Sequence, residues 1–226
     1  MDVAIVIPAY NEERSIGAVV KGLRQKGYCD IIVVDDGSKD KTGRIAERAG
    51  ALVLRHVINR GQGAALKTGI DYAVHVGANV IVTFDADGQH RVEDIPAMIA
   101  PVKKGLCDVT LGSRFLKKKS NVPFLKRLVL KGGILFNWLI YGVCLSDAHN
   151  GFRALSKKAA ERIDITADKM EHASEILEEL KKKHLKYREV PVTIRYTDYS
   201  LKKGQGPLRS IPLGFRMILR KFMRML

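Results

Sequence analysis

Short apolar runs rich in β-branched residues alternate with helix-like segments through the first half of this chain. The runs lie at residues 3–7, 31–34, 51–54 and 80–84, and Thr83 is the one polar residue within them. Such a run is typical of a strand in a parallel sheet that helices cover on both faces, whereas a strand with one wet face alternates. The pattern therefore predicts an α/β fold with a mostly parallel central sheet and helices on both faces.

The segments between these strands carry helix signals, and further elements follow in the second half. We expect helices over residues 11–26, from 40 or 41 to 50, over 63–77, over 95–104 and over 170–184. Asn11 is the expected N-cap of the first helix, with Glu12 and Glu13 in its first turn. Strands are expected at 109–111 and 187–196, and Pro191 indicates an edge or bulged strand.

Length and composition limit the classes of protein that fit. The 226 residues suit one domain with an appended arm, and 46% apolar with 28% charged residues exclude a disordered or disulfide-scaffold protein. The three cysteines form no CxxC pair, so we expect neither a zinc site nor a disulfide framework, and a reducing, cytosolic compartment is favoured. No signal peptide is visible, nor an uncharged run of the roughly 20 residues that span a bilayer.

The net charge of +15 calls for an anionic partner, which can be phosphate, nucleic acid or an anionic membrane. A nucleic-acid-binding protein is the rival from another class, but the sequence has no recognisable nucleic-acid motif. The acidic strand ends described next would also repel a phosphate backbone unless they held a metal. We therefore expect no nucleic-acid partner.

Two carboxylates, Asp85 and Asp87, directly follow the run at residues 80–84. Ligands of parallel sheets sit at the carboxyl ends of strands, so both side chains are expected to project into the site. Hard oxygen ligands of this kind suit Mg²⁺ or Mn²⁺, which would hold a substrate's phosphates. The alternative interpretation is a solvated acidic turn.

Two other strand ends also carry polar groups. Asp36 follows the run at 31–34, where a carboxylate can accept hydrogen bonds from a base or ribose; the alternative is a turn that only caps the next helix. Pro8, Tyr10 and Glu12 follow the first run and offer a stiff loop, a stacking face and an acceptor. The alternative there is a helix cap with a surface tyrosine.

A glycine-containing segment, residues 59–67, precedes the third expected helix. Glycines such as Gly63 allow a backbone to approach phosphate closely, and Lys67 adds a positive charge. The Gly-Lys-Ser/Thr ending of a Walker loop is missing. A tight loop–helix junction is the other reading.

Together, these four motifs resemble the family 2 glycosyltransferases with the GT-A fold, over about residues 1–200. Within that family the chain looks most like the polyprenyl-phosphate (dolichyl-phosphate) mannose or glucose synthases. The narrower resemblance is carried by the second half: Gly-Ser-Arg-Phe at 112–115, Asp-Ala-His-Asn-Gly-Phe-Arg at 147–153, Val-Pro-Val at 190–192 and Lys-Lys-Gly at 202–204. The family often has Ser or Thr near the position of Asn150, and its residues differ from this chain over 170–175.

The resemblance implies a role for each matching residue. Nucleotide contacts are implied for Pro8, Tyr10, Glu12 and Asp36, and we place Gly63 and Lys67 with them as phosphate-side candidates. Mg²⁺ or Mn²⁺ would be held by Asp85 and Asp87, with Gln89 completing the shell. The acceptor phosphate would be bound by Arg114 and Arg153, assisted by Lys202 or Lys203.

The implied reaction is a single in-line displacement, with inversion, that moves a sugar from a UDP- or GDP-sugar to a polyprenyl phosphate. A phosphate monoester is already anionic near pH 7 and needs little help from a base. A hydroxyl acceptor, such as a glycan, is the alternative and would need a carboxylate base. Candidates for that base are Asp147, Glu171 and Glu175, although residues 171–175 also resemble an ordinary exposed helix start.

Two segments have the character of membrane-surface helices. Residues 211–226 place apolar side chains on one helical face and basic ones off it, and residues 124–141 surround Trp138 with Leu, Ile and Phe. The alternative is that both pack in the core or between subunits. We expect a catalytic domain over 1–205, with a nucleotide-sugar half at 1–94 and an acceptor half at 95–205, and a membrane helix at 206–226. The protein would then be peripheral at the cytoplasmic face of the membrane, with or without a separate membrane protein as partner.

Overall fold

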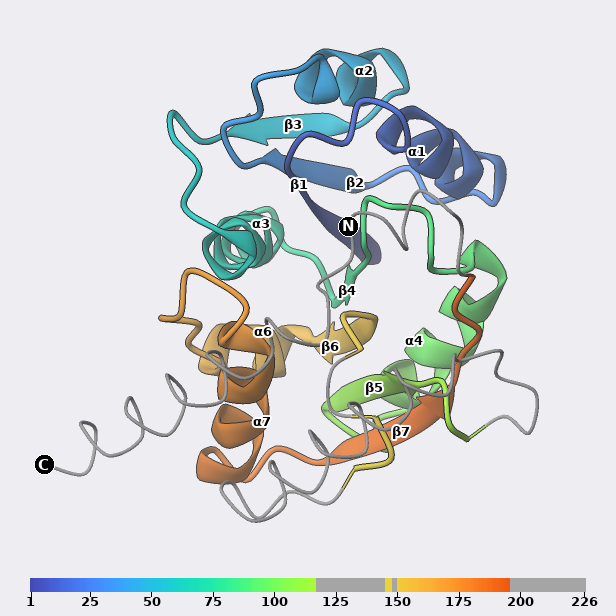
Figure 1. The fold of residues 1–226 in the computed structure, drawn as a ribbon. Coiled ribbons are helices and arrows are strands. Elements are labelled where there is room, and N and C mark those ends of the chain that lie inside the picture. Colours follow the sequence, from blue (N-terminus) through green and yellow to red (C-terminus); the bar gives the residue numbers. More distant parts are fainter. Residues whose placement is uncertain (117–144, 148–149, 196–226) are drawn as a thin grey trace, which may run out of the picture.

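A computed structural model describes residues 1–116, 145–147 and 150–195 of this chain (Figure 1). The expectations for residues 124–141, for Lys202 and Lys203, and for a helix over 206–226 lie outside these residues. Within them, no helix is long and apolar enough to cross a membrane.

The described residues contain a central seven-stranded sheet with strand order β3-β2-β1-β4-β6-β5-β7. Only β6 runs antiparallel to its neighbours, and all other pairs are parallel. The strands are β1 (Val3–Ala9), β2 (Ile31–Asp35), β3 (Leu52–Arg55), β4 (Val80–Thr83), β5 (Val109–Ser113), β6 (Arg153–Ser156) and β7 (Tyr187–Pro191). The prediction of a mostly parallel sheet is confirmed.

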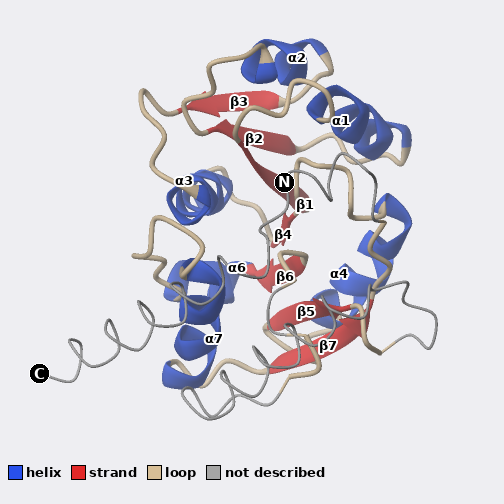
Figure 2. Ribbon diagram, viewed as in Figure 1, coloured by secondary structure: helices blue, strands red, loops and turns tan. Residues whose placement is uncertain are grey.

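Helices cover both faces of the sheet, as Figure 2 shows. One face carries α3 (Gln62–His75), α6 (Lys157–Arg162) and α7 (His172–Lys182). The other carries α1 (Ile16–Gln25), α2 (Thr42–Arg48) and α4 (Ile95–Lys103), the last preceded by the short 3₁₀ helix η1 (Val92–Asp94). Every residue of β1 after Val3 is buried, as is all of β2 and β4, because both faces of these strands are covered.

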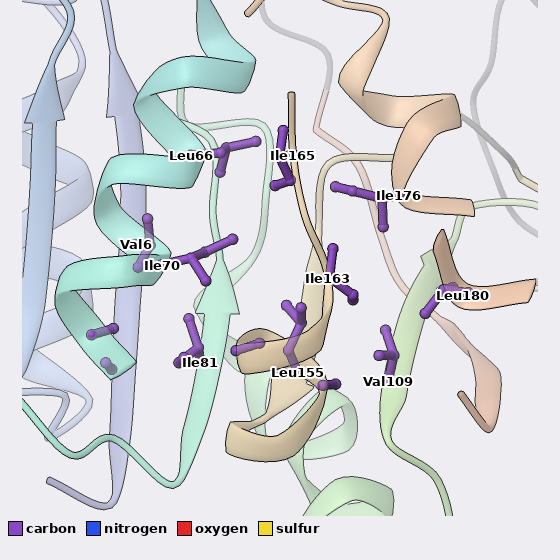
Figure 3. Packing of buried hydrophobic residues seen from close by; sticks show 14 of the residues in the cluster. Val6, Leu66, Ile70, Ile81, Val109, Leu155, Ile163, Ile165, Ile176 and Leu180 are labelled. Atoms are coloured by element: carbon purple, nitrogen blue, oxygen red, sulfur yellow. The ribbon is translucent and has the colours of Figure 1, made fainter. Parts of the chain in front are cut away.

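Alternate residues of the central strands pack into two separate cores. In the core shown in Figure 3, Val6 and Ile81 meet Leu66 and Ile70 of α3, and Ile176 of α7 joins from the other side. The neighbouring strand residues point the opposite way, toward α1 and α4. Each fully buried aliphatic side chain contributes about 1.5–3 kcal/mol, so the two cores fix the strands in register.

The topology brings the carboxyl ends of the parallel strands and the start of β6 together at one edge of the sheet. Val6 pairs with Thr83, and Thr83 with Arg153. Because β6 is antiparallel, its first residue lies where β1, β2, β4 and β5 end. Residues that follow β4 and precede β6 therefore meet, although they are far apart in the sequence.

The first helix begins later than expected. Asn11 has a φ of 53° and is not a cap; its side-chain oxygen accepts a hydrogen bond from Lys39 N, and its own N–H donates to Ser38 Oγ. These contacts tie the loop after β1 to the loop after β2, so α1 begins only at Ile16, with no acidic residue in its first turn. The expected helix start at residue 11 is wrong because tertiary hydrogen bonds replace the cap.

Two elements of the second half, β6 and α6, were not expected. The sequence of β6, Arg-Ala-Leu-Ser, contains no β-branched residue. Its strand conformation comes from pairing with β4 on one side and β5 on the other. The expectation that Pro191 marks an edge strand is confirmed, because β7 is the last strand of the sheet and ends at Pro191.

Candidate active site

Asp85, just past β4, is held by protein hydrogen bonds on both of its oxygens. His90 Nε2 lies 2.7 Å from Oδ2, and Gln62 Nε2 lies 3.5 Å from Oδ1. Burial by itself would raise the pKa of this carboxyl, but His90, Arg153 and His172 outweigh it and hold the pKa below its usual value. Asp85 is therefore ionised at neutral pH.

Asp87, two residues on, lies close enough to Asp85 to feel its charge. Burial and the negative charge of Asp85 raise the pKa of Asp87 above its usual value. Gln89 supports this carboxylate with two hydrogen bonds, from its backbone N–H (3.0 Å) and from Nε2 (2.7 Å). The repulsion between the two carboxylates is the strain that a bound cation would relieve.

The described residues include no cluster of three or more His, Cys, Asp or Glu side chains arranged to hold a metal. Asp85 and Asp87 nevertheless fit Mg²⁺ or Mn²⁺, because Mg²⁺ is commonly bound by one or two carboxylates plus substrate phosphates. The like-charge repulsion that raises the pKa of Asp87 supports this fit. Gln89 contacts Asp87, so its amide is placed beside the same carboxylate.

His90 and two phenylalanines form an apolar layer under the carboxylates. The His90 ring lies 5.3 Å from the Phe84 ring and 4.9 Å from the Phe152 ring, centroid to centroid. Its Nδ1 is buried and finds no hydrogen-bond partner among the residues that the structure describes. Gly151 completes the enclosure, because a Cβ there would lie 2.9 Å from Asp85 Oδ1.

Arg153, the first residue of β6, is a buried cation with free donors. Its side chain is among the largest that are fully buried, with 1% exposure, and its Nε and Nη1 have no partner among the described residues. Burial lowers the pKa of the guanidinium to about 10, against the charges of Asp85 and Asp147, so it remains protonated at neutral pH. An unpaired buried cation is costly, and an anion is the group that would satisfy it.

Arg114 and Asp147 form a second buried pair near the end of β5. Arg114 Nε lies 2.6 Å from Asp147 Oδ2, and the backbone N–H of Arg114 donates to the same oxygen at 3.1 Å. Glu189 of β7 accepts from the backbone N–H groups of Ser146 and Asp147, which holds the turn that carries Asp147. Within residues 1–116, 145–147 and 150–195, the other oxygen of Asp147, Oδ1, is buried and has no hydrogen-bond partner, and the same holds for Asn150 Nδ2.

Asp36 makes its contacts with the protein itself. Its Oδ1 lies 2.7 Å from His56 Nδ1 and accepts from Arg60 N, while Oδ2 accepts from Asn59 Nδ2 and Gly61 N. Four donors from one loop therefore share the two carboxylate oxygens. Asp36 therefore holds the loop at residues 56–61 in its conformation. The nucleotide contact that the resemblance implies for Asp36 would come in addition.

The first strand end is ordered by contacts of Glu12. Its backbone N–H donates to Thr42 Oγ1 at 2.7 Å, and its carboxylate accepts from Ser15 Oγ at 2.7 Å. The negative charge of Glu12 also contributes to the raised pKa of Asp87, so the two side chains are near one another. Pro8 is buried at the end of β1, and Tyr10 is exposed enough to offer a ring face.

The glycine segment before α3 packs against protein. The N–H groups of Gly63 and Ala64 donate to Asp168 O, and a Cβ on Gly63 would lie 1.9 Å from Ala167 O. These contacts favour a tight junction between loop and helix over a backbone segment that approaches phosphate. Lys67 lies further along α3, where its ammonium pairs with Asp71 at 2.7 Å.

His172 and Glu175 at the start of α7 are both buried, so the reading of an exposed helix start is wrong for them. Burial and the charge of Arg153 lower the pKa of His172 to about 4. Glu175 accepts hydrogen bonds from the turn at Thr166 and Ala167. This turn reaches α3 and places His172 near Asp85 and Arg153.

The edge of the sheet thus brings together several residues that the motifs singled out. Asp85, Asp87 and Arg153 interact electrostatically, and Glu12, Gln89 and Asp147 join them through the contacts above. Sequence reasoning did not assign roles to His90 or Gly151. His90 is the last residue of the segment 85–90, which begins with the two aspartates, and Gly151 lies in the motif at 147–153. Their position inside these motifs was the one sequence signal that could have identified them.

Known proteins resemble this chain both in sequence and in fold. Residues 4–164 match the family described as glycosyl transferase family 2. The UDP-N-acetylglucosamine–dolichyl-phosphate N-acetylglucosaminyltransferase of Methanococcus voltae is 34% identical over 243 residues, which cover 98% of this chain and 97% of that protein. The dolichol-phosphate mannosyltransferase of Pyrococcus furiosus is 33% identical over 219 residues, which cover 91% of this chain and 60% of that protein.

Among solved structures, the fold is similar to that of glucosyl-3-phosphoglycerate synthase from Mycobacterium tuberculosis. The crystal structure of its complex with Mn²⁺, UDP-glucose and phosphoglyceric acid superposes with a TM-score of 0.73 at 17% identity, covering 96% of this chain and 77% of that one. At this identity the likeness shows the fold alone, which is the GT-A fold.

Proposed function

The chain belongs to glycosyl transferase family 2, and from that membership we propose that it moves a sugar from a nucleoside diphosphate sugar to a polyprenyl phosphate of the dolichyl type. The observation that supports a phosphate acceptor is the state of Arg153, a fully buried cation near Asp85 and Asp147. Two of its nitrogens have no hydrogen-bond partner in the part of the chain that the structure describes. A guanidinium binds phosphate through two parallel hydrogen bonds. The relatives in M. voltae and P. furiosus, both named for dolichyl-type phosphate acceptors, support the same acceptor.

The donor, a UDP- or GDP-sugar, would lie across the ends of β1, β2 and β4. Pro8, Tyr10 and Glu12 would contact the nucleotide, while Asp36 shapes the neighbouring loop. Asp85 and Asp87 would hold Mg²⁺ or Mn²⁺, which when bound neutralises charge on the departing diphosphate. Gln89 keeps Asp87 oriented for this, and His90 does the same for Asp85.

The reaction is one displacement with inversion. An oxygen of the acceptor phosphate bonds to the anomeric carbon as the bond from that carbon to the diphosphate oxygen breaks. Arg153 would hold the attacking phosphate, with Arg114 next to it and kept in place by Asp147. The acceptor's second pKa is about 6, so it arrives as an anion and needs no base.

A hydroxyl acceptor is less well supported, because it would require a free carboxylate base. Glu175 is committed to the turn at Thr166 and Ala167, and Asp147 is bound to Arg114 through Oδ2. The third candidate, Glu171, is half-buried at the N-cap of α7. The contacts of Glu175 and Asp147 favour an acceptor that brings its own negative charge. A polyprenyl chain remains in the bilayer, so we infer that the protein works at the membrane surface, on its cytoplasmic face.

The test is transfer of labelled sugar from a panel of UDP- and GDP-sugars to a short polyprenyl phosphate, with Mn²⁺ or Mg²⁺ and with EDTA. The matched control acceptor is the corresponding polyprenol, which differs only in lacking the phosphate. We expect a lipid-linked sugar only with the phosphate and only with metal. Equal transfer to the polyprenol would move the acceptor to a hydroxyl, and transfer in EDTA would remove the metal from the site.

A further inference from the structure

The turn between α6 and α7, residues 163–171, is fixed to α7 by Glu175. The carboxylate of Glu175 accepts hydrogen bonds from Thr166 N at 3.0 Å, from Thr166 Oγ1 at 2.6 Å and from Ala167 N at 2.7 Å. Glu175 is buried, so these bonds form where water competes little and are strengthened accordingly. The turn cannot shift without breaking them.

The same turn is fixed to the N-terminus of α3. The carbonyl oxygen of Asp168 accepts from Gly63 N at 2.7 Å and from Ala64 N at 3.1 Å. A Cβ on Gly63 would lie 1.9 Å from Ala167 O and 2.9 Å from His172 Cβ. Glycine at position 63 is therefore what allows the turn and His172 to come this close to α3.

The ring of His172 is held in one tautomer. Nδ1 lies 2.7 Å from Lys169 O. A carbonyl oxygen only accepts, so Nδ1 carries the proton and Nε2 keeps a lone pair. The pKa of about 4, which follows from burial and from the charge of Arg153, keeps the ring neutral at neutral pH. Among the described residues nothing donates a hydrogen bond to Nε2.

The surroundings of His172 decide what class of ligand it can take. Asp85 and Arg153 are both near enough for their charges to act on the ring. On the proposed function, Asp85 belongs to the diphosphate side and Arg153 to the acceptor phosphate, so the transferred sugar lies between them. A lone pair repels phosphate oxygens and accepts hydrogen bonds from hydroxyl groups.

Resting on that function, we propose that Nε2 of His172 accepts a hydrogen bond from a hydroxyl of the transferred sugar and so takes part in selecting the donor. Contacts at Glu175, Asp168 and Lys169 hold the turn and fix the ring through Nδ1, so Nε2 keeps one position relative to α3. His172 is then a specificity-determining residue that the family motifs do not include.

The test measures donor binding, not turnover, by titration calorimetry with Mn²⁺ present. The probes are UDP-N-acetylglucosamine, UDP-glucose and GDP-mannose, followed by the monodeoxy analogues of the sugar that binds best. Three variants are compared with the parent chain. His172→Asn keeps a donor for Lys169 O and loses the acceptor, whereas His172→Gln returns an amide oxygen near the Nε2 position. His184→Asn is the matched control, at an exposed residue whose φ of 50° asparagine tolerates.

In the parent chain, we expect removal of one particular hydroxyl to weaken binding roughly 3- to 10-fold, the usual worth of a neutral hydrogen bond. That loss should vanish in His172→Asn, return at least partly in His172→Gln and persist in His184→Asn. An unchanged pattern of losses in His172→Asn would overturn the proposal, because a merely structural histidine would weaken all analogues alike.

If His172→Asn does not fold, as judged by circular dichroism, the His172→Gln variant decides. In that variant, removal of the same hydroxyl must still weaken donor binding, and a loss at a different hydroxyl would overturn the proposal. Failure of the lipid transfer assay with normal donor binding would count against the acceptor and not against His172.

Discussion

At the scale of single residues, His90 shows how one side chain can serve two purposes. Its Nε2 lies 2.7 Å from Asp85 Oδ2, so the ring donates to a candidate metal ligand. The ring also packs, tilted, against both Phe84 and Phe152, which contact each other as well, and this apolar cluster shields that hydrogen bond from water. Loss of the partner that orients a metal ligand typically weakens metal binding or activity by about 10- to 100-fold.

We therefore predict that His90→Phe lowers the apparent affinity for Mn²⁺ by roughly 10- to 100-fold. Phenylalanine keeps the aromatic packing and removes the hydrogen bond to Asp85 Oδ2, whose loss leaves that oxygen without an oriented partner. The measurement is the rate of sugar transfer as a function of Mn²⁺ concentration. His75→Phe, at an exposed position near the end of α3, is the control and should titrate like the parent chain. An unchanged Mn²⁺ dependence in His90→Phe would show that Asp85 needs no support from the ring.

What the sequence reveals at this scale depends on whether a residue acts through its position or through its surroundings. That Asp85 and Asp87 lie together at the edge of the sheet was predictable, because both directly follow a buried strand; their role as metal ligands stays a prediction. The contacts of Asp36 were not predictable, since four donors from residues 56–61 reach it only after β3 has paired with β2. For His172, the sequence offered only a lone histidine, whose role as a ligand, a donor or a structural residue it left open. Its tautomer and its pKa come from Lys169, Arg153 and burial.

At the scale of elements, the close contact between α3 and the turn at 163–171 leaves no room for a side chain at position 63. We predict that Gly63→Ala destabilises the protein by about 1–3 kcal/mol, the usual cost of overpacking. The added methyl group must displace the backbone at Ala167 or the side chain of His172, and neither is the free end of a flexible chain. The measurement is urea unfolding followed by circular dichroism.

Gly22→Ala is the matched control for this prediction. Gly22 lies inside α1, where a Cβ would meet only Val92 Cγ2 at 3.9 Å. Alanine is the better helix former, so this change should stabilise the protein by about 0.5–1 kcal/mol. Opposite signs for the two glycines would confirm that contact, not helix propensity, decides position 63. A Gly63→Ala variant as stable as the parent chain would contradict the close approach.

Elements were predictable where the local pattern and the tertiary environment agree. β1, β2 and β4 are buried on both faces and read as continuous apolar runs, so their existence followed from the residues. β6 is the opposite case, because Arg-Ala-Leu-Ser has no strand signal and is extended only through its two partners. This strand also carries Arg153, so the sequence identified the arginine without showing that it would be buried next to Asp85.

At the scale of the whole molecule, charge is the property that bears on where the protein works. The chain carries 39 Lys and Arg against 24 Asp and Glu, a net charge of +15. Each basic residue close to an anionic bilayer adds about 1 kcal/mol of binding. A protein that takes a lipid-linked acceptor gains from this attraction, because it is held at the surface where the acceptor phosphate lies.

We predict that the 226-residue chain sediments with vesicles containing phosphatidylserine and not with vesicles of phosphatidylcholine alone. The attraction should weaken as salt is added, because the screening length falls from about 10 Å at 0.1 M to about 3 Å at 1 M. The measurement is the bound fraction at a series of NaCl concentrations with both vesicle types. Binding that is equal on the two lipids and indifferent to salt would mean that apolar insertion, not charge, brings the protein to the membrane. The absence of binding at low salt would leave the acceptor to be delivered by another component, and the surface location would then be wrong for this chain alone.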